Sequence, residues 1–441
     1  MVYYSELDRK PYNIMKNTIK RIIKDFHSTS FPKFHNRILN VPLDLDKIIT
    51  IIGPRRAGKT LYLFQLMMQL TEMGITKKQL LYINFEDERL ELDGQYDLII
   101  ESYIELYPDI QLNTCYLFFD EIQELNKWEK YVRRLFDTVT KNIFISGSNA
   151  RLLSREISTA LRGRTLSFEL LPLSFTEYLQ FHQIDTSDTW STRNTSIIQH
   201  AFEDYVTWGG FPELVHMDKQ YKLKTLQEYF NVMIYRDLIE RYEIKSVHML
   251  KYILKRLIST FTKEYSVNKI FNELKSKGES VSKTSLYELM EQIMSVYMVA
   301  VVEKYDQSVV KREMSNRKIY LYDTGLTSVT RLSEDRGKIL ENIVFVHLLR
   351  INARVFFIKN SWECDFIALQ HHSHETMAIQ VTQQLNHMNM KRELKGLETA
   401  KKQLSDCKPL LLFHEKEESL NLPDVYTYQP IWLWLLNMHQ N

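Results

Sequence analysis

The 441-residue sequence contains only three cysteines, Cys115, Cys364 and Cys407, and they lie far apart. No two of them form a C-x-x-C pair, which argues against a disulfide scaffold and a zinc site and fits a reducing cytoplasm. The N-terminus lacks a charged-then-apolar signal pattern. No apolar run approaches the roughly 18 residues of a membrane span. We therefore expect a cytoplasmic protein with no membrane partner.

The sequence also lacks a large net charge, because 57 Lys and Arg nearly balance 55 Asp and Glu. The charge is nevertheless uneven: residues 81–130 hold 13 acidic and 3 basic residues, whereas residues 241–320 hold 15 basic and 9 acidic ones. This asymmetry suggests different partners for the two regions, although two ordinary solvated faces would give the same pattern. The length predicts two or three domains with a sizeable core.

One short stretch, residues 48–60, predicts a nucleotide site. The β-branched run Ile48–Ile52 indicates a buried strand, and a G-x-x-x-x-G-K-[ST] pattern follows it. In such a loop the backbone N–H groups point at phosphate oxygens, the lysine reaches the β- and γ-phosphates, and the threonine hydroxyl binds Mg²⁺. The next helix directs its positive end at the same phosphates. The predicted ATP-binding residues are Gly53, Pro54, Arg55, Arg56, Ala57, Gly58, Lys59 and Thr60.

A second nucleotide signature is the hydrophobic run that ends in Asp120 and Glu121, about 60 residues after the loop. We expect Asp120 to hold Mg²⁺ through its water shell, and Glu121 to polarise the attacking water. A strand that ends in two carboxylates is weak evidence alone. Its distance from the phosphate loop makes it strong.

Two further catalytic candidates follow. Ser148, with Asn149 second, ends a predicted strand and could sense the γ-phosphate, although a helix N-cap before Arg151 fits equally well. Arg164, with Arg162 beside it, could stabilise charge on the γ-phosphate, either in the same chain or from a neighbouring subunit. A surface arginine pair is the alternative.

Strands that alternate with helices behind a phosphate loop predict a three-layer α/β sheet. The separate glutamate, Glu121, places the sheet in the branch of nucleotide hydrolases that has an extra central strand. The sequence resembles a prokaryotic family of AAA-type ATPases whose members carry a C-terminal domain of unknown function. The resemblance covers the chain to about residue 385 and rests on Gly53–Thr60, Phe118–Gln123 with Trp128, Ser146–Asn149, Gly163-Arg164 with Leu171–Phe175, Trp208–Glu213 and Arg236-Asp237.

The resemblance implies five parts: an N-terminal helix and linker (1–46), a P-loop ATPase domain (47–180), a helical linker or lid (181–245), a winged helix-turn-helix (246–325) and a nuclease-like α/β domain (326–441). The expected activity is Mg²⁺-dependent ATP hydrolysis that drives or gates a conformational change of the C-terminal half. An ATP-regulated DNA-binding protein or nuclease is the alternative. A homo-oligomer is compatible with the sequence.

The winged helix could bind DNA through a third helix and a basic loop between its strands. The expected contacts are Lys283, Lys311, Arg312 and Arg317. Glu288 and Glu291 on the same helix are unfavourable for phosphate, so a winged helix used only for packing is the alternative.

The last part resembles the restriction-endonuclease-like fold. Glu341 and Asp365 match its helix and strand carboxylates, but Gln380 and Thr382 stand where a glutamate and a lysine are expected. We therefore expect no Mg²⁺-dependent DNA cleavage, unless a lysine from elsewhere, such as Lys391, fills the gap. A loop with three histidines is expected to be a solvated hairpin tip, with a metal cluster as the alternative: His371, His372 and His374.

Overall fold

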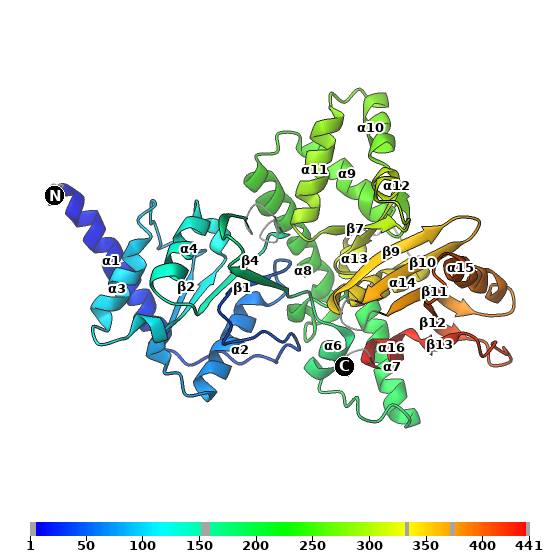
Figure 1. The fold of residues 1–441 in the computed structure, drawn as a ribbon, viewed down its shortest axis with the longest axis horizontal. Coiled ribbons are helices and arrows are strands. Elements are labelled where there is room, and N and C mark those ends of the chain that lie inside the picture. The colour runs from blue at the N-terminus through cyan, green and yellow to red at the C-terminus, as the bar shows by residue number, and fades with distance from the viewer. Residues whose placement is uncertain (1–5, 151–158, 331–334, 371–374, 438–441) are drawn as a thin grey trace. The chain divides into compact units, whose positions relative to one another are not determined.

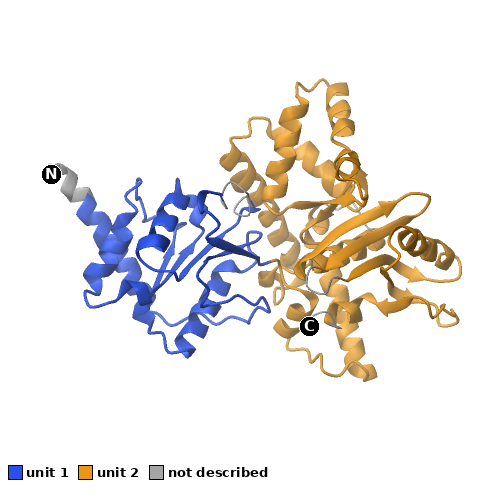
Figure 2. Cartoon of the chain, in the orientation of Figure 1, with its two compact units in different colours: residues 1–170 blue, residues 171–441 orange. Residues whose placement is uncertain are grey.

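A computed structural model describes residues 6–150, 159–330, 335–370 and 375–437 (Figure 1). The chain forms two compact units, residues 1–170 and 171–441 (Figure 2). The three histidines 371, 372 and 374 lie outside the described residues, as does the helix start expected at Arg151. Within the described part, no helix is long and apolar enough to cross a membrane. Cys115, Cys364 and Cys407 are buried free thiols.

The first unit is built on a parallel five-stranded sheet in the order β2-β3-β4-β1-β5. Strand β4 lies between β1 and β3, which confirms the extra central strand. Because all the strands are parallel, their carboxyl ends share one edge, where the phosphate loop and the two carboxylates also lie. The strands are β1 (Ile48–Ile52), β2 (Leu80–Asn84), β3 (Tyr116–Asp120), β4 (Ile143–Gly147) and β5 (Thr165–Glu169).

Helices cover both faces of this sheet, because alternate strand residues point to opposite sides. Ile48 and Ile52 pack in a core with α1, α3 and α4, whereas Ile49 and Ile51 pack with Leu63 and its neighbours on α2. The three-layer α/β arrangement is therefore as predicted. The helices are α1 (Glu6–Ser28), α2 (Lys59–Glu72), α3 (Asp97–Leu106) and α4 (Trp128–Thr138), with short 3₁₀ turns η1 (Lys77–Gln79), η2 (Leu112–Thr114) and η3 (Ile122–Glu124).

The second unit begins with helices and contains an eight-stranded sheet in the order β13-β12-β11-β10-β9-β7-β8-β6. A short parallel pairing of β7 with β9 joins the small antiparallel sheet β6-β8-β7 to the other five strands. The strands are β6 (Glu264–Tyr265), β7 (Val299–Lys304), β8 (Arg317–Leu321), β9 (Ala353–Lys359), β10 (Glu363–Gln370), β11 (Thr376–Leu385), β12 (Lys408–Lys416) and β13 (Thr427–Pro430).

The helices of the second unit cover its sheet and form the segment that precedes it. They are α6 (Phe175–Phe181), α7 (Thr192–Trp208), η5 (Pro212–Leu214), α8 (Lys219–Val232), the π-helix η6 (Met233–Glu240), α9 (Val247–Ser259), α10 (Val267–Ser276), α11 (Lys283–Ser295), α12 (Val309–Met314), α13 (Gly325–Thr330), α14 (Arg336–Arg350), α15 (Met390–Gln403) and α16 (Ile431–Asn437).

The prediction of a basic loop between two strands of this unit is wrong in part. Lys311 and Arg312 lie on the short helix α12, which the Ser308 hydroxyl caps by accepting a hydrogen bond from the Lys311 N–H group. Arg317 and Lys318 belong to β8. Because Ser308 caps the residues that follow it, Val309–Met314 form a helix, although the polar residues on either side favour a loop.

The Gly209-Gly210 pair anchors the start of the second unit. Gly209 has φ 75°, and a Cβ atom there would lie 1.9 Å from Asp323 Oδ1, so only glycine fits. The Gly210 N–H donates to Asp323 Oδ2 at 2.7 Å, and the Gly210 carbonyl accepts from the Leu173 N–H at 2.6 Å. The segment that follows β5 is thereby fixed to the helices of its own unit.

Candidate nucleotide site

The loop after β1 has the backbone shape of a phosphate-binding loop. Gly53 has φ 155°, and a Cβ atom there would lie 2.1 Å from the Leu170 carbonyl oxygen, so the position requires glycine. Arg56 also adopts a positive φ of 67°. Arg55 Nη1 lies 2.8 Å from Glu86 Oε1, which ties the loop to the acidic residues after β2. The loop then enters α2 at Lys59.

The side chain of Lys59 points back into this loop and is only 4% exposed. Its Nζ donates to the Gly53 carbonyl at 3.2 Å and to the Pro54 carbonyl at 3.1 Å. The same Nζ lies 3.4 Å from Glu121 Oε1. The ammonium group therefore lies between the loop that would hold phosphate and the carboxylate expected to act on water.

Asp120 ends β3 and is completely buried. Its Oδ2 accepts hydrogen bonds from the Thr60 hydroxyl at 2.7 Å and the Tyr82 hydroxyl at 3.0 Å, while Ser146 donates to Oδ1. Burial raises the pKa of Asp120 above its ordinary value, and the Glu121 charge raises it further. A hydroxyl and a carboxylate side by side form the hard oxygen donor set that Mg²⁺ prefers, so Thr60 and Asp120 fit that ion.

Glu121 adopts a left-handed backbone, with φ 51°, which turns its side chain away from the strand direction. Its Oε2 accepts a hydrogen bond from Gln123 Nε2 at 2.6 Å, and its N–H donates to Ser146 Oγ at 3.0 Å. Burial opposes ionisation, but the Lys59 charge and the Gln123 hydrogen bond hold the pKa of Glu121 below its ordinary value. Lys59 and Gln123 therefore both favour the carboxylate form of Glu121.

Sequence reasoning missed three residues of this group: Tyr82, Gln123 and Ser146. Tyr82 comes from β2, so only the β2-β3 register brings it to Asp120. Ser146 lies two residues before the chosen candidate Ser148. The sequence pattern does not tell which serine at this strand end faces Asp120, and the structure shows that it is Ser146.

Ser148 is 2% exposed, and its hydroxyl has no hydrogen-bond partner among the described residues. Asn149 is also buried. The Ser148 hydroxyl makes no hydrogen bond to Asp120 or Glu121, so its action on the γ-phosphate stays a prediction. A buried hydroxyl without a partner is compatible with that role.

The structure does not bring Arg164 to these residues. Arg164 precedes Thr165, which is in register with Ile48 at the start of β1, whereas the phosphate loop follows the other end of β1. A five-residue strand spans roughly 16 Å, and Arg164 Nε is paired with Asp137 Oδ1 at 2.9 Å. Arg164 therefore does not act at the loop of its own chain in this structure, because parallel strands place it at the opposite edge.

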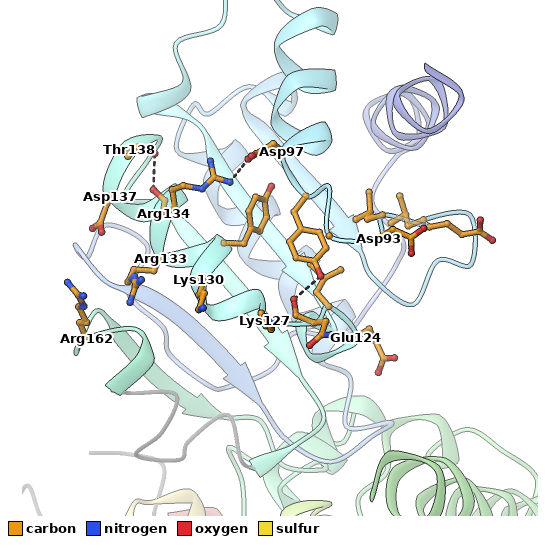
Figure 3. A pocket seen from close by; sticks show the side chains of 18 residues that line it. Asp93, Asp97, Glu124, Lys127, Lys130, Arg133, Arg134, Asp137, Thr138 and Arg162 are labelled. Atoms are coloured by element: carbon orange, nitrogen blue, oxygen red, sulfur yellow. Dashed lines mark hydrogen bonds and ion pairs between the residues drawn. The ribbon is translucent and has the colours of Figure 1, made fainter. Parts of the chain in front are cut away.

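A second cavity, of about 1140 Å³, lies beside α4 in the same unit (Figure 3). Its lining includes four basic side chains, Lys127, Lys130, Arg133 and Arg162. An ion pair between Arg134 and Asp97 also lines it. No phosphate-loop residue lines this cavity. Arg162 therefore faces a different space from the nucleotide site.

The C-terminal candidates converge on another cavity, of about 640 Å³. As the resemblance implied, the cavity is lined by Glu341 from α14, Asp365 from β10, and Gln380 and Thr382 from β11. Lys318 of β8 is paired with Glu341 and Asp365, and Lys338 of α14 lines the cavity. Lys391 does not line it.

Comparisons with known proteins agree with this geometry. Residues 45–179 match a family model described as an AAA domain, and residues 199–336 match one described as a domain of unknown function, DUF8612. The "Uncharacterized protein MJ1544" of Methanocaldococcus jannaschii is 35% identical over 420 residues, which cover 92% of this chain and 91% of that protein. The chain belongs to the family of MJ1544.

Another relative in this family is an "Uncharacterized protein" of Haemophilus influenzae, which is 30% identical over 328 residues, or 74% of this chain and 80% of that protein. Among solved structures, the Walker-type ATPase PABY2304 of Pyrococcus abyssi is 14% identical, with a TM-score of 0.41, over 72% of this chain and 95% of that chain. So low a score supports no argument about activity. The AAA domain match and the parallel sheet together identify a P-loop ATPase type of fold in the first unit.

Proposed function

We propose that the chain binds ATP with Mg²⁺ at the loop after β1 and hydrolyses it. The observation that carries this proposal is the convergence of Lys59, Thr60, Asp120 and Glu121 at one edge of the sheet. These residues come from two separate sequence motifs. Their meeting at the carboxyl ends of β1 and β3 supports the proposal, because phosphate binding, Mg²⁺ binding and activation of water must occur within reach of one another.

Each residue has a distinct task in the proposed reaction. The loop amides and Lys59 hold the β- and γ-phosphates, so Lys59 exchanges the carbonyls of Gly53 and Pro54 for phosphate oxygens. When Lys59 moves to phosphate, Glu121 loses its nearest cation and is free to accept a proton from the attacking water. Thr60 and Asp120 would hold Mg²⁺, which neutralises charge on the phosphates.

We further propose that the nucleotide state gates the C-terminal half. β5 lies directly beside β1, and the chain that leaves β5 is fixed in the second unit at Pro172 and Leu173. Tyr205 donates to the Leu173 carbonyl at 2.9 Å, and Arg350 donates to the Pro172 carbonyl. A shift of β5 on nucleotide binding would pull on this anchored segment.

Two measurements test the proposal. The first is phosphate release from ATP and Mg²⁺, with and without duplex DNA, by the wild-type chain. The second is hydrogen exchange at the Leu173 and Gly210 amides with and without a non-hydrolysable ATP analogue. Hydrolysis without any change in exchange would support the ATPase and reject gating through this segment.

A second candidate function is DNA binding by a winged helix, because α10, α11 and the sheet β6-β8-β7 follow that order of elements. The exposed face of α11 presents Lys283 and Tyr287 but also Glu288. Arg317 is paired with Glu303 at 3.3 Å. The exposed Lys311 and the half-buried Arg312 are therefore the better phosphate contacts.

At the nucleotide site, Arg164 of a neighbouring copy in a homo-oligomer remains a candidate to contact the γ-phosphate.

A further inference from the structure

Lys318 is a charged side chain in an almost fully buried position, with 2% of its surface exposed. Its Nζ lies 2.6 Å from Glu363 Oε1, 3.1 Å from Glu341 Oε1 and 4.0 Å from Asp365 Oδ1. A buried charge is stable only when it is paired. Three carboxylates from two elements, α14 and β10, supply that pairing.

The backbone of β8 fixes Lys318 among these carboxylates. β8 is the middle strand between β6 and β7, and Lys318 is in register with Glu264 on one side and Val302 on the other. Tyr320 lies two residues further along the same face and donates to Glu341 Oε1 at 2.6 Å. The pairing on both sides fixes the Lys318 backbone, and therefore the point from which its side chain reaches the carboxylates.

The electrostatics of the cluster keep the ammonium group charged. Burial lowers the pKa of Lys318, but the charges of Glu341, Asp365 and Glu363 outweigh burial and raise it above its ordinary value. For Asp365, burial and the Glu341 charge raise the pKa well above its ordinary value, although Lys318 acts in the opposite direction. Lys318 is thus the principal counter-charge of the cluster.

We propose that Lys318 is the resident cation of this carboxylate cluster and takes the place of a divalent metal ion among Glu341, Glu363 and Asp365, which line the adjoining cavity. Mg²⁺ requires about six oxygen ligands at roughly 2.0–2.1 Å, and an ammonium group at the centre of the carboxylates repels it. Gln380 is a weaker ligand than a carboxylate for such an ion, because its amide oxygen Oε1 carries no charge, although that oxygen has no hydrogen-bond partner among the described residues. Among the described residues, no three or more His, Cys, Asp or Glu side chains form a group that could hold a metal ion.

This inference does not depend on ATP hydrolysis, so it is tested on the nucleotide-free chain. Mn²⁺ is titrated into the wild type and into Asp365→Ala, and bound Mn²⁺ is counted by electron paramagnetic resonance. The expected result is the same number of sites in both. A site in the wild type that Asp365→Ala removes would overturn the proposal, whether or not any other variant folds.

The complementary experiment removes the cation. Lys318→Met and the more polar Lys318→Gln are expected to gain one Mn²⁺ site, which the added change Asp365→Asn removes. Mn²⁺ should raise the melting temperature of the Lys318 variants and leave that of the wild type unchanged. Lys318→Arg keeps the charge and should gain no site. A folded Lys318→Met chain that binds no additional Mn²⁺ would contradict the proposal.

Discussion

Lys59 Nζ lies 3.4 Å from Glu121 Oε1, so the lysine expected to bind phosphate also neutralises the carboxylate expected to activate water. Both side chains are buried, and opposite charges attract strongly in such surroundings. The contact connects substrate binding with catalysis, because phosphate oxygens would compete with Glu121 for the same ammonium group. The next three predictions follow from this pair and its neighbours.

Lys59→Ala should abolish tight ATP binding, because it removes the cation that the loop directs at the β- and γ-phosphates. Isothermal titration with ATP and Mg²⁺ measures the affinity. Lys130→Ala, an exposed lysine on α4 in the same unit, is the matched control and should bind like the wild type. An affinity of Lys59→Ala within a few-fold of the wild type would mean that phosphate binds elsewhere.

Glu121→Gln should bind ATP but hydrolyse it at least ~100-fold more slowly, which is the usual contribution of a positioned base. The exposed neighbour Glu124→Gln is the control and should keep the wild-type rate. Single-turnover hydrolysis separates the chemical step from binding. Turnover of Glu121→Gln at the wild-type rate would remove this residue from the mechanism.

Gln123→Ala should lower kcat by roughly 10-fold, because a hydrogen bond to a charged group contributes about 1.5 kcal/mol. The affinity for ATP should stay unchanged. Since the Gln123 hydrogen bond helps to hold the pKa of Glu121 below its ordinary value, the acid limb of kcat should move to higher pH. The exposed Gln95→Ala is the control. A reduced rate with an unshifted pH profile would indicate that Gln123 has only a structural role.

Asp323 predicts a pH dependence of stability, because burial raises its pKa to about 6 despite the two glycine N–H donors. Its folded pKa thus exceeds the unfolded value of about 3.9. The stabilising contribution of Asp323 is complete below about pH 3.9 and is lost as the pH rises through about 6. The free energy of unfolding falls by at most about 3 kcal/mol over this range.

The stability of the wild type relative to Asp323→Asn should therefore decrease between about pH 4 and pH 6. Melting temperatures of both proteins across this range check the trend. Asp218→Asn, at an exposed position, should show no such change relative to the wild type. A difference that is constant or grows with pH would show that Asp323 is ionised in the folded state throughout.

If the winged helix binds DNA, the charge-reversal pair Lys311→Glu and Arg312→Glu should weaken binding on any sequence. Phosphate contacts dominate such binding, so the wild-type affinity should also fall steeply with salt. Binding to a duplex at several salt concentrations tests both expectations. Absence of wild-type binding at low salt would reject the DNA hypothesis and favour a protein-contact role.

The first unit could be predicted closely because its signals are local. The run Ile48–Ile52 forms a strand with these bounds, and the spacing from the loop to Asp120 fixes the motif. Tyr82 and Ser146 were missed because they meet Asp120 only through the strand order, whereas Gln123 lies two residues after Glu121 and carried no motif signal of its own. For Arg164, nothing in its sequence surroundings reveals the sheet edge on which it lies, so the sequence could not choose between action in the same chain and action on a neighbouring subunit.

The second unit shows more clearly which contacts a sequence pattern does not reveal. Glu341, Asp365 and Gln380 could be aligned with a known pattern, and the structure brings them together. Lys318 belongs to a different strand pair, and only the β7-β9 pairing and the packing of α14 bring it to these carboxylates. The pattern contains no position for such a residue, so sequence reasoning could name only a lysine from elsewhere.

The parallel pairing of β7 with β9 also decides how the second half can be handled in the laboratory. A cut near residue 325 would leave β7 and β9 with unpaired edges, and exposed edges recruit other chains. Shortened versions of the protein that end or begin there should precipitate, whereas a version that begins near residue 171 retains the whole sheet. The parts expected from the sequence to be separate, residues 246–325 and 326–441, should therefore be expressed and purified as one piece.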